Sequence, residues 1–378
     1  MRPASEVERR RLNELFAELC AITSPSHRER AVADRVTAEL EALGLEVAED
    51  DAAAATAGDA GNLVARLPGR AERTVAFCAH LDTVPHDEPV EPVLVDGGWE
   101  SAGDTILGAD NKAAVAMLLA LAHRTALEGS PVEVELLFTV GEEDALSGAK
   151  VFDRSRLRAG QAFVFDHATP IGEVVVAAPA SYRLEASFRG AAAHAGLNPE
   201  AGRSAIVAAA RAIAAMRLGR VDEETTANVS WVAGGRPGAT NVVPERCTLR
   251  GEARSLSDAA VEALVAEMVD RCYDGANDPS CECDVDIAVE RLFAGYRHAA
   301  VAPGVVAAEA ALRACGYTPR RVLSGGASDA NALVAAGLPC TNVANGTERN
   351  HEPTERVSQA ALEGMLDVTF ALLDELGA

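Results

Sequence analysis

Apolar residues along the chain recur either at the three- and four-residue spacing of a helix or in short runs typical of strands. Helical spacing predicts amphipathic helices over residues 5–21 and 28–43, the second opening on a capping box of Ser26 and Glu29 and ending at Gly44. Strands are predicted over residues 62–67, 74–79, 132–140, 162–165 and 173–177, with a helix over 112–127 and a surface loop at 52–56. This alternation predicts a parallel or mixed sheet with helices on both faces.

The pattern changes after residue 180. Alternating strands and apolar helices follow in the order strand 182–188, helix 203–216, strands 225–232 and 247–253, helix 258–273 and strand 283–289. That order is typical of a ferredoxin-like α+β unit. The α/β alternation then resumes with helix 301–315, strand 321–323, helix 329–336, strand 341–344 and a last helix from residue 358. We therefore predict an α/β fold, with a mixed, largely parallel sheet sandwiched by helices, built from residues 1–178 and 292–378. An α+β ferredoxin-like domain is inserted between them at residues 179–291.

Composition narrows the class of protein. The chain has 378 residues, of which 48% are hydrophobic and 24% charged, which excludes a disordered, collagenous or small disulfide-stapled protein. With 34 basic and 57 acidic residues the net charge is −23, which argues against nucleic acid and anionic membranes as partners. The eight cysteines form no C-x-x-C pair, and neither a signal peptide nor an apolar stretch of membrane-spanning length is present. We expect a cytoplasmic protein with reduced thiols.

Acidic and imidazole side chains stand where the predicted strands end. They are His80 and Asp82 after strand 74–79, Glu142 and Glu143 after 132–140, Asp166 after 162–165, His351 after 341–344, and Asp110 at the start of helix 112–127. In open α/β sheets, ligands bind outside the carboxyl ends of the strands. Two histidines and several carboxylates meeting there have the composition of a two-metal site, which holds its ions about 3.5–4 Å apart around an attacking water. Mixed nitrogen and oxygen ligands suit zinc, with manganese or cobalt as alternatives.

Each of these residues alone also has a structural explanation. Asp110 could be a helix N-cap, Asp166 a turn residue, and the two consecutive glutamates part of a solvated loop. Ser328 and Asp329 could likewise cap the helix 329–336. The metal-site hypothesis is preferred because it explains all the strand-end residues at once.

The order and spacing of these residues resemble a known enzyme family. His80-Leu-Asp82, Gly108-Ala-Asp110-Asn-Lys112, Gly141-Glu142-Glu143 and His351 resemble the M20 family of co-catalytic zinc peptidases, and within it the peptidase T-type tripeptide aminopeptidases. Supporting stretches are Thr105 to Lys112, Gly190 to Gly196, Thr240-Asn241 and Ser324 to Asn331, so the resemblance covers essentially the whole chain. The sequence departs from the usual family pattern at His167 and Ala327, two positions near the expected substrate site.

The resemblance implies a role for each residue. His80 and Asp166 would hold one metal ion, Glu143 and His351 the other, and Asp110 would bridge the two. Glu142 would be the general base, and Asp82 would hydrogen-bond the second nitrogen of His80. The inserted domain would be a lid that carries His194 to the oxyanion, with Asn241 and Arg254 holding the substrate and Ser328 lining the pocket.

The predicted function is cleavage of short peptides by a cytoplasmic exopeptidase with two divalent ions, and pairing of lids into a homodimer is left open. Three alternatives share the same fold: an M20 carboxypeptidase or dipeptidase, an amidohydrolase acting on N-acyl amino acids, and a binding protein without activity. A two-metal phosphoesterase is disfavoured, because no glycine-rich anion loop or basic cluster accompanies the site.

Overall fold

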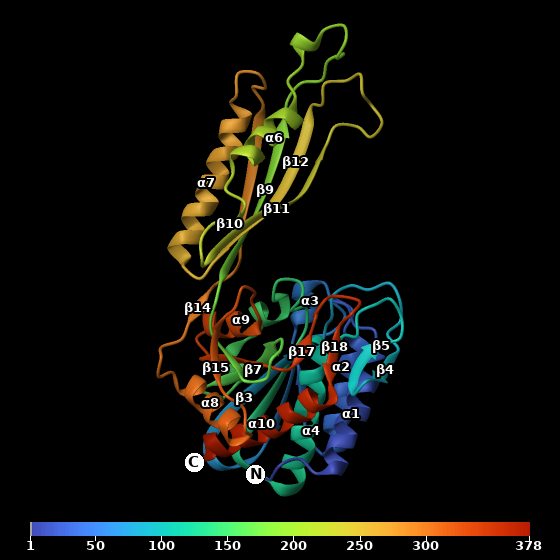
Figure 1. Ribbon diagram of the computed structural model, residues 1–378, viewed down its shortest axis with the longest axis vertical. Helices are drawn as coiled ribbons and strands as arrows, with labels where there is room; N and C mark the ends of the chain where they lie inside the picture. The colour runs from blue at the N-terminus through green and yellow to red at the C-terminus, as the bar shows by residue number, and fades with distance from the viewer. Residues whose placement is uncertain (1) are drawn as a thin grey trace. The chain divides into compact units, whose positions relative to one another are not determined.

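The computed structural model describes residues 2–378 and divides into two compact units. Unit 1 comprises Met1–Ala177 and Arg297–Ala378, and unit 2 comprises Ala178–Tyr296 (Figure 1). The predicted roles of the two parts of the chain, a catalytic domain and a lid at residues 179–291, stay predictions. Helices of the described chain are either too short or too polar to span a bilayer.

A nine-stranded sheet runs through the described part of unit 1. Across the sheet its strands are β1 (Val47–Glu49), β2 (Leu63–Leu67), β6 (Ser130–Thr139), β3 (Gly69–His80), β7 (Ala162–His167), β16 (Cys340–Ala344), β8 (Glu173–Ala178) and β14 (Tyr296–Arg297), with β15 (Arg320–Leu323) pairing β8. β3 pairs β6 and β7 in parallel, and β7 pairs β16 in parallel, whereas β2 pairs β6 antiparallel. The predicted α/β class with a mixed, mostly parallel sheet is confirmed.

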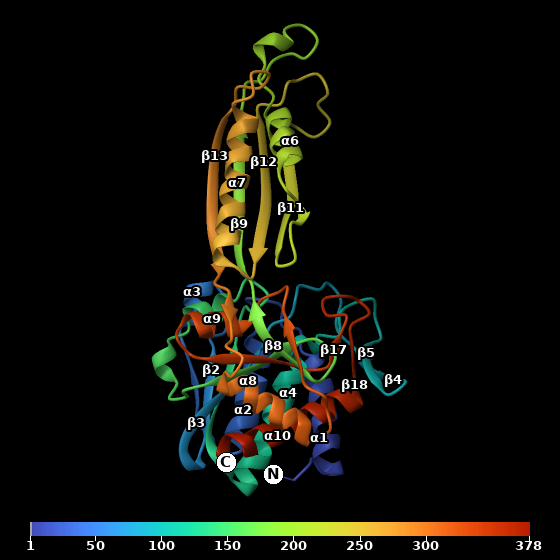
Figure 2. The same cartoon turned by 60° about the vertical axis from the view of Figure 1, so that its left-hand side comes forward.

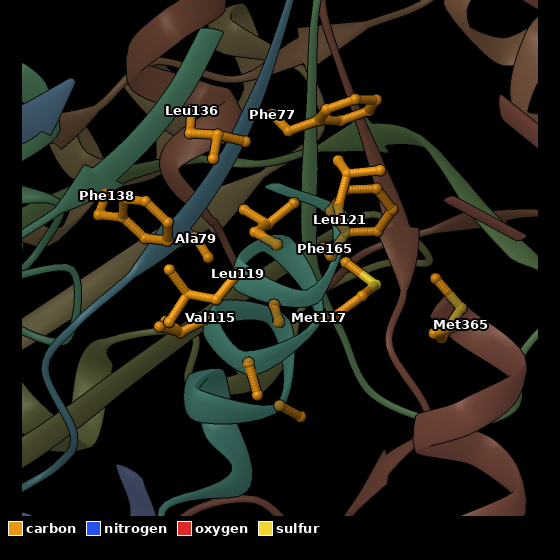
Figure 3. Packing of buried hydrophobic residues seen from close by; sticks show 14 of the residues in the cluster. Phe77, Ala79, Val115, Met117, Leu119, Leu121, Leu136, Phe138, Phe165 and Met365 are labelled. Atoms are coloured by element: carbon orange, nitrogen blue, oxygen red, sulfur yellow. The ribbon is translucent and has the colours of Figure 1, made fainter. Parts of the chain in front are cut away.

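Helices pack against this sheet and bury its apolar side chains. They are α1 (Glu6–Cys20), α2 (Arg30–Ala42), α3 (Ala52–Thr56), α4 (Ala109–Glu128), α5 (Ser147–Val151), α8 (Pro303–Ala314), α9 (Asp329–Ala335) and α10 (Gln359–Gly377), with a 3-10 turn η1 (Arg154–Arg156). Figure 3 shows Val115 and Leu119 of α4 gathered with Phe138 of β6 and Ala79 of β3. α4 is buried along most of its length, so its first turn, which carries Asp110, is fixed by the core.

A second, smaller sheet in unit 1 is not predicted by the sequence. It has the order β17 (Thr347–Glu348), β18 (Arg356–Ser358), β5 (Gly98–Ser101) and β4 (Pro92–Val95), all antiparallel. These strands have two to four residues, too few to show an apolar period. The sheet fixes both ends of the loop 349–355, which carries His351 and Glu355.

Unit 2 has its own sheet and its own core. Its strands lie in the order β10 (Gly219–Arg220), β11 (Thr225–Gly234), β12 (Arg246–Ser255), β9 (Ala180–Arg189) and β13 (Asp284–Phe293), and its helices are α6 (Ala205–Ala215) and α7 (Asp258–Ala276), with a 3-10 turn η2 (Pro199–Ala201) (Figure 2). All pairs in the sheet are antiparallel. The order β9-α6-β11-β12-α7-β13 along the chain is the ferredoxin-like arrangement predicted from the sequence.

Two local predictions in unit 1 are wrong. Residues 52–56 form the short helix α3 rather than a loop. The capping box of Ser26 and Glu29 does not form, and α2 starts at Arg30 without a side-chain cap. The Ser26 hydroxyl donates to Asp82 (2.7 Å), and the Glu29 carboxylate accepts from the N–H groups of His27 and Gly141. The side chains that would form the local cap are therefore hydrogen-bonded to residues distant in sequence, Asp82 and Gly141.

Candidate active site

The carboxyl ends of three parallel strands bring the first site residues together. His80 ends β3 and lies opposite Thr139, the last residue of β6, while Cys78 of β3 lies opposite Val164 of β7. Because these strands run in register, the residues that follow them emerge at one edge of the sheet. Glu142 and Glu143 follow β6 there, and Asp166 stands near the end of β7. Asp110 comes to the same edge from the first turn of α4, and His351 from the loop between β17 and β18.

Asp110 lies between the two histidines, with one carboxylate oxygen toward each. Its Oδ1 is 3.4 Å from Nε2 of His80, and its Oδ2 is 3.3 Å from Nε2 of His351. On one side, Asp166 Oδ1 is 3.7 Å from Nε2 of His80. On the other side, Glu143 Oε1 is 2.8 Å from Nε2 of His351.

Two sets of possible ligand atoms each fall within 4.8 Å of one another. One set is His80, Glu142 and Asp166, and the other is His80, Asp110 and Glu143. Nε2 of His80 and Oδ1 of Asp110 are buried and make no hydrogen bond. Buried polar atoms without partners are rare, so these two atoms fit the presence of a cation. The residues present therefore suit divalent metal ions, since imidazole nitrogen and carboxylate oxygen are the ligands that zinc, manganese and cobalt accept.

The charges of the site support the same conclusion. Burial and the negative charge of Asp110 raise the pKa of Asp166 to about 8. Burial and the charge of Asp166 also raise the pKa of Glu142 well above its ordinary value. Burial alone would lower the pKa of His80, but Asp110 and Asp166 raise it well above the ordinary value. These shifts arise because several carboxylates lie close together and are buried from water. Bound divalent cations would offset the repulsion between their negative charges.

Asp82 organises the site through the main chain of its neighbours. Its Oδ1 accepts from the N–H of Glu142 (2.9 Å), and its Oδ2 accepts from the N–H of Glu143 (3.1 Å). Nδ1 of His80, which the prediction pairs with Asp82, faces both oxygens of that residue: the main-chain carbonyl is 3.0 Å away and the carboxylate Oδ1 is 3.4 Å away.

Unit 2 places its three predicted residues in two different regions. His194 follows β9, and its segment pairs with that of Asn241, because the N–H of Ala195 donates to the Asn241 carbonyl (2.9 Å). Nδ1 of His194 accepts from the N–H of Gly196 (3.2 Å), which leaves Nε2 as the ring nitrogen available to donate. β12 begins at Arg246, and Arg254 lies near its other end, about 25 Å away along the extended strand. The Arg254 guanidinium pairs with Glu252 (3.0 Å). Within unit 2, Arg254 is therefore not grouped with His194 and Asn241.

Comparison with known proteins places the chain in a family. The peptidase dimerisation domain of the M20 family matches residues 179–278, and peptidase family M28 matches residues 62–195. The uncharacterized protein YqjE of Bacillus subtilis is 36% identical over 373 residues, covering 98% of this chain and 99% of that protein. The aminopeptidase PepT of Bacillus cereus is 37% identical with a TM-score of 0.88, covering 98% of this chain and 99% of that one. This chain belongs to the M20 peptidase family.

The relationship extends to the peptidase T-like branch. A tripeptidase from Staphylococcus aureus is 32% identical with a TM-score of 0.92, and 98% of each chain is covered. Peptidase T of Salmonella paratyphi A is 25% identical over 360 residues. The protein is thus a peptidase T-like M20 hydrolase that carries the peptidase dimerisation domain.

Two further residues of this M20 peptidase's site, Asn350 and Glu355, are not predicted by the sequence pattern. Asn350 donates through Nδ2 to Asp110 Oδ2 (2.8 Å). Glu355 is buried, and its carboxylate accepts from the N–H groups of Leu107, Gly108 and Asp110. Burial raises the pKa of Glu355 to about 7, although these three N–H donors oppose the shift. Both residues lie in the irregular loop 349–355, where neither spacing nor flanking strands give a signal.

Asp329 and Ser328 also have tertiary roles in the M20 peptidase. The Thr139 hydroxyl donates to Asp329, which is buried, and the Cys78 thiol lies 3.9 Å from the same carboxylate. Ser328 Oγ accepts from the Asn342 amide (3.1 Å), whose two polar atoms bond the main chain of Asp166. Ser328 thus supports the strand end that carries Asp166, and its predicted contact with substrate stays a prediction.

Proposed function

We propose that this M20 peptidase is a two-metal exopeptidase that removes the N-terminal residue from short peptides, of the tripeptide aminopeptidase kind. The observation that carries the proposal is the position of Asp110, whose two oxygens face two different imidazoles. Each imidazole has a further carboxylate beside it, Asp166 for His80 and Glu143 for His351. One carboxylate between two nitrogen-and-oxygen pairs is the arrangement expected for a pair of bridged divalent ions.

Zinc is the proposed metal, with manganese and cobalt as alternatives. His80 and Asp166 would hold one ion, Glu143 and His351 the other, and Asp110 would bridge them. When bound, such a pair lowers the pKa of a water molecule and polarises the scissile carbonyl.

Glu142 is the proposed general base. It is buried, and its carboxylate lies within 4.8 Å of the possible ligand atoms of His80 and Asp166. Its main-chain N–H donates to Asp82. It would take a proton from the attacking water and deliver that proton to the departing amine, a transfer that needs a carboxylate beside the water rather than on the metal.

Residues 179–291 form the proposed lid and dimerisation domain, and residues 1–178 and 292–378 the proposed catalytic domain. His194 would donate from Nε2 to the oxyanion that forms during attack, since its Nδ1 accepts from Gly196. Asn241, Arg254 and Ser328 are proposed to contact the peptide. The match to a peptidase dimerisation domain supports pairing of two chains through the lid. The proposed location is the cytoplasm, with neither nucleic acid nor membrane as a partner.

The named relatives support the substrate class. The Bacillus cereus structure is that of an aminopeptidase and the Staphylococcus aureus structure that of a tripeptidase, and both cover 98% of this chain. The non-specific dipeptidase of Escherichia coli is 34% identical but covers only 39% of this chain. The alternatives, carboxypeptidase, dipeptidase or N-acyl-amino-acid amidohydrolase, would use the same metal ligands.

Product analysis on one tripeptide and its blocked forms tests the proposal. The enzyme is freed of metal with a chelator and reconstituted with zinc, manganese or cobalt. The substrates are the free tripeptide, its N-acetyl form, its C-terminal amide, a dipeptide and an N-acyl amino acid. We expect release of the N-terminal residue from the free and the amidated tripeptide, and none from the acetylated one. Release of the C-terminal residue or of an acyl group would show one of the alternatives, and no turnover with any metal would contradict an enzymatic function.

A further inference from the structure

The loop 349–355 holds Asp110 from two directions. His351 and Asn350 face the Asp110 carboxylate, at 3.3 Å and 2.8 Å from Oδ2. Glu355, four positions after the histidine, faces the Asp110 main chain instead. Its Oε1 accepts from the Asp110 N–H at 2.9 Å.

The other oxygen of Glu355 binds the turn that leads into α4. Oε2 accepts from the N–H groups of Leu107 (3.0 Å) and Gly108 (2.8 Å). Gly108 has a φ of +74°, in the left-handed region that favours glycine, so the chain turns at this residue immediately before α4. The start of a helix leaves several N–H groups without partners in the helix itself, and this turn is buried. One carboxylate therefore satisfies three donors that water cannot reach.

Glu355 is not available as a metal ligand. Both of its oxygens are engaged by main-chain N–H groups, and its side chain is 1% exposed. The nearby Lys112 is also buried, and its Nζ donates to the Ile22 carbonyl. Glu355 can influence the chemistry only through the residue that it holds.

We propose that Glu355 is a positioning residue that fixes the main chain of Asp110, so that the two Asp110 oxygens already face His80 and His351 before metal binds. The inference rests on the proposed two-metal function and adds a residue to it. Carboxylate ligands are commonly oriented by outer hydrogen bonds, and loss of such a partner typically weakens metal binding or activity by about 10–100-fold.

Glu355→Gln is the main test, with Glu352→Gln as the control. The amide can keep an oxygen toward two of the N–H groups but turns its NH₂ group against the third, so Asp110 must move. Glu352 is an exposed glutamate of the same loop, and its substitution likewise replaces a carboxylate by an amide of the same size. Metal affinity is measured by competition with a chromophoric chelator, together with kcat, KM and the thermal stability of the metal-free proteins.

We expect Glu355→Gln to bind zinc about 10–100-fold more weakly than wild type, with kcat recovering as zinc is raised and KM for the peptide little changed. Glu352→Gln should match wild type. A variant that is less stable when metal-free but binds zinc with wild-type affinity would make Glu355 merely structural and overturn the inference. Wild-type protein that binds no divalent ion would overturn the proposed function itself, which is a different result.

Hydrogen exchange on the wild-type protein gives a second test that does not need the variant to fold. In the metal-free protein, amides in a peptide covering residues 105–111 should exchange slowly, because Glu355 already binds three of them. Exchange of these amides at the rate of an unstructured chain until zinc is added would show that metal, not Glu355, arranges the turn, and would overturn the inference.

Discussion

The carboxylate of Asp82 holds the main chain of Glu142, with Oδ1 accepting its N–H at 2.9 Å. The second oxygen makes the equivalent bond to the next residue, Glu143, at 3.1 Å. A single buried side chain two residues beyond the end of β3 thus fixes the two consecutive glutamates that follow β6. One of these is the proposed base and the other a proposed ligand, so their relative placement depends on Asp82.

Asp82→Asn should therefore damage metal binding and turnover together. The amide NH₂ group would face one of the two N–H groups, while the bond from His80 to the Asp82 carbonyl would remain. We expect about a 10–100-fold loss in zinc affinity or in kcat, measured by chelator competition and peptide hydrolysis. Ser26→Ala removes only one hydrogen bond to the same carboxylate and should cause a smaller loss. Equal effects of the two substitutions would contradict the role given to Asp82.

Glu142→Gln should separate metal binding from catalysis. The amide cannot accept the proton of the attacking water, and loss of a general base typically lowers the rate by about 10²–10⁴-fold. Metal content, measured by mass spectrometry, should stay near that of wild type. Glu143→Gln is the matched comparison and should lose metal instead. Substantial turnover by Glu142→Gln, or loss of its metal, would make Glu142 a bystander or a ligand.

The part of the site that could be predicted from the sequence lies at strand ends. His80, Glu143 and Asp166 follow apolar runs, and parallel strands in register necessarily bring such positions to one edge. The positions of these residues follow from the order of strands and helices and from the type of sheet. Apolar residues at every second position predict the strands, and apolar residues three or four positions apart predict the helices.

The rest depended on tertiary contacts that no local pattern encodes. Glu355 is separated from Asp110 by 245 residues along the chain, and the strands of the small sheet that fix its loop are too short to predict. Ser26 illustrates the converse, because its local pattern indicated a helix cap but Asp82 binds its hydroxyl. Asn241 and Arg254, both predicted to hold the substrate, lie in different regions of unit 2, because the length of β12 separates them.

His194→Ala tests the proposed lid. Its neighbours in the chain are small residues, and the side chain is exposed, so packing does not explain a histidine there. One donor to an oxyanion is worth about 10²–10³ in rate. We expect kcat and kcat/KM to fall together by about that factor, since the contact is made in the transition state. Metal content and unfolding temperature should not change, and His123→Ala, on α4, should retain full activity. Normal turnover in His194→Ala would show that this residue is structural.

An ion pair far from the site makes stability depend on pH. Arg124 is fully buried, and its Nε and Nη2 donate to the Glu8 carboxylate at 2.6 Å and 2.8 Å, while its guanidinium lies 3.4 Å from the centre of the Phe370 ring. Burial would raise the pKa of Glu8, but the hydrogen bonds from Arg124 and Arg2 outweigh it and hold that pKa well below its ordinary value.

Glu8→Gln should leave the Arg124 charge buried without its partner and lower the free energy of unfolding by about 3–5 kcal/mol at pH 7. Because the folded-state pKa of Glu8 is lowered, its stabilisation is complete above the unfolded-state pKa of about 4.3 and is lost as pH falls through the folded-state value. The free energy of unfolding, measured with urea, should therefore differ between wild type and Glu8→Gln by a constant amount from roughly pH 6 to pH 8. That difference should shrink below about pH 4. Glu6 is exposed and lies in the same helical turn, so the control variant Glu6→Gln should unfold like wild type. A difference that persists unchanged at pH 3, about one unit below the unfolded-state pKa, would mean that lost packing rather than the lost charge explains the effect.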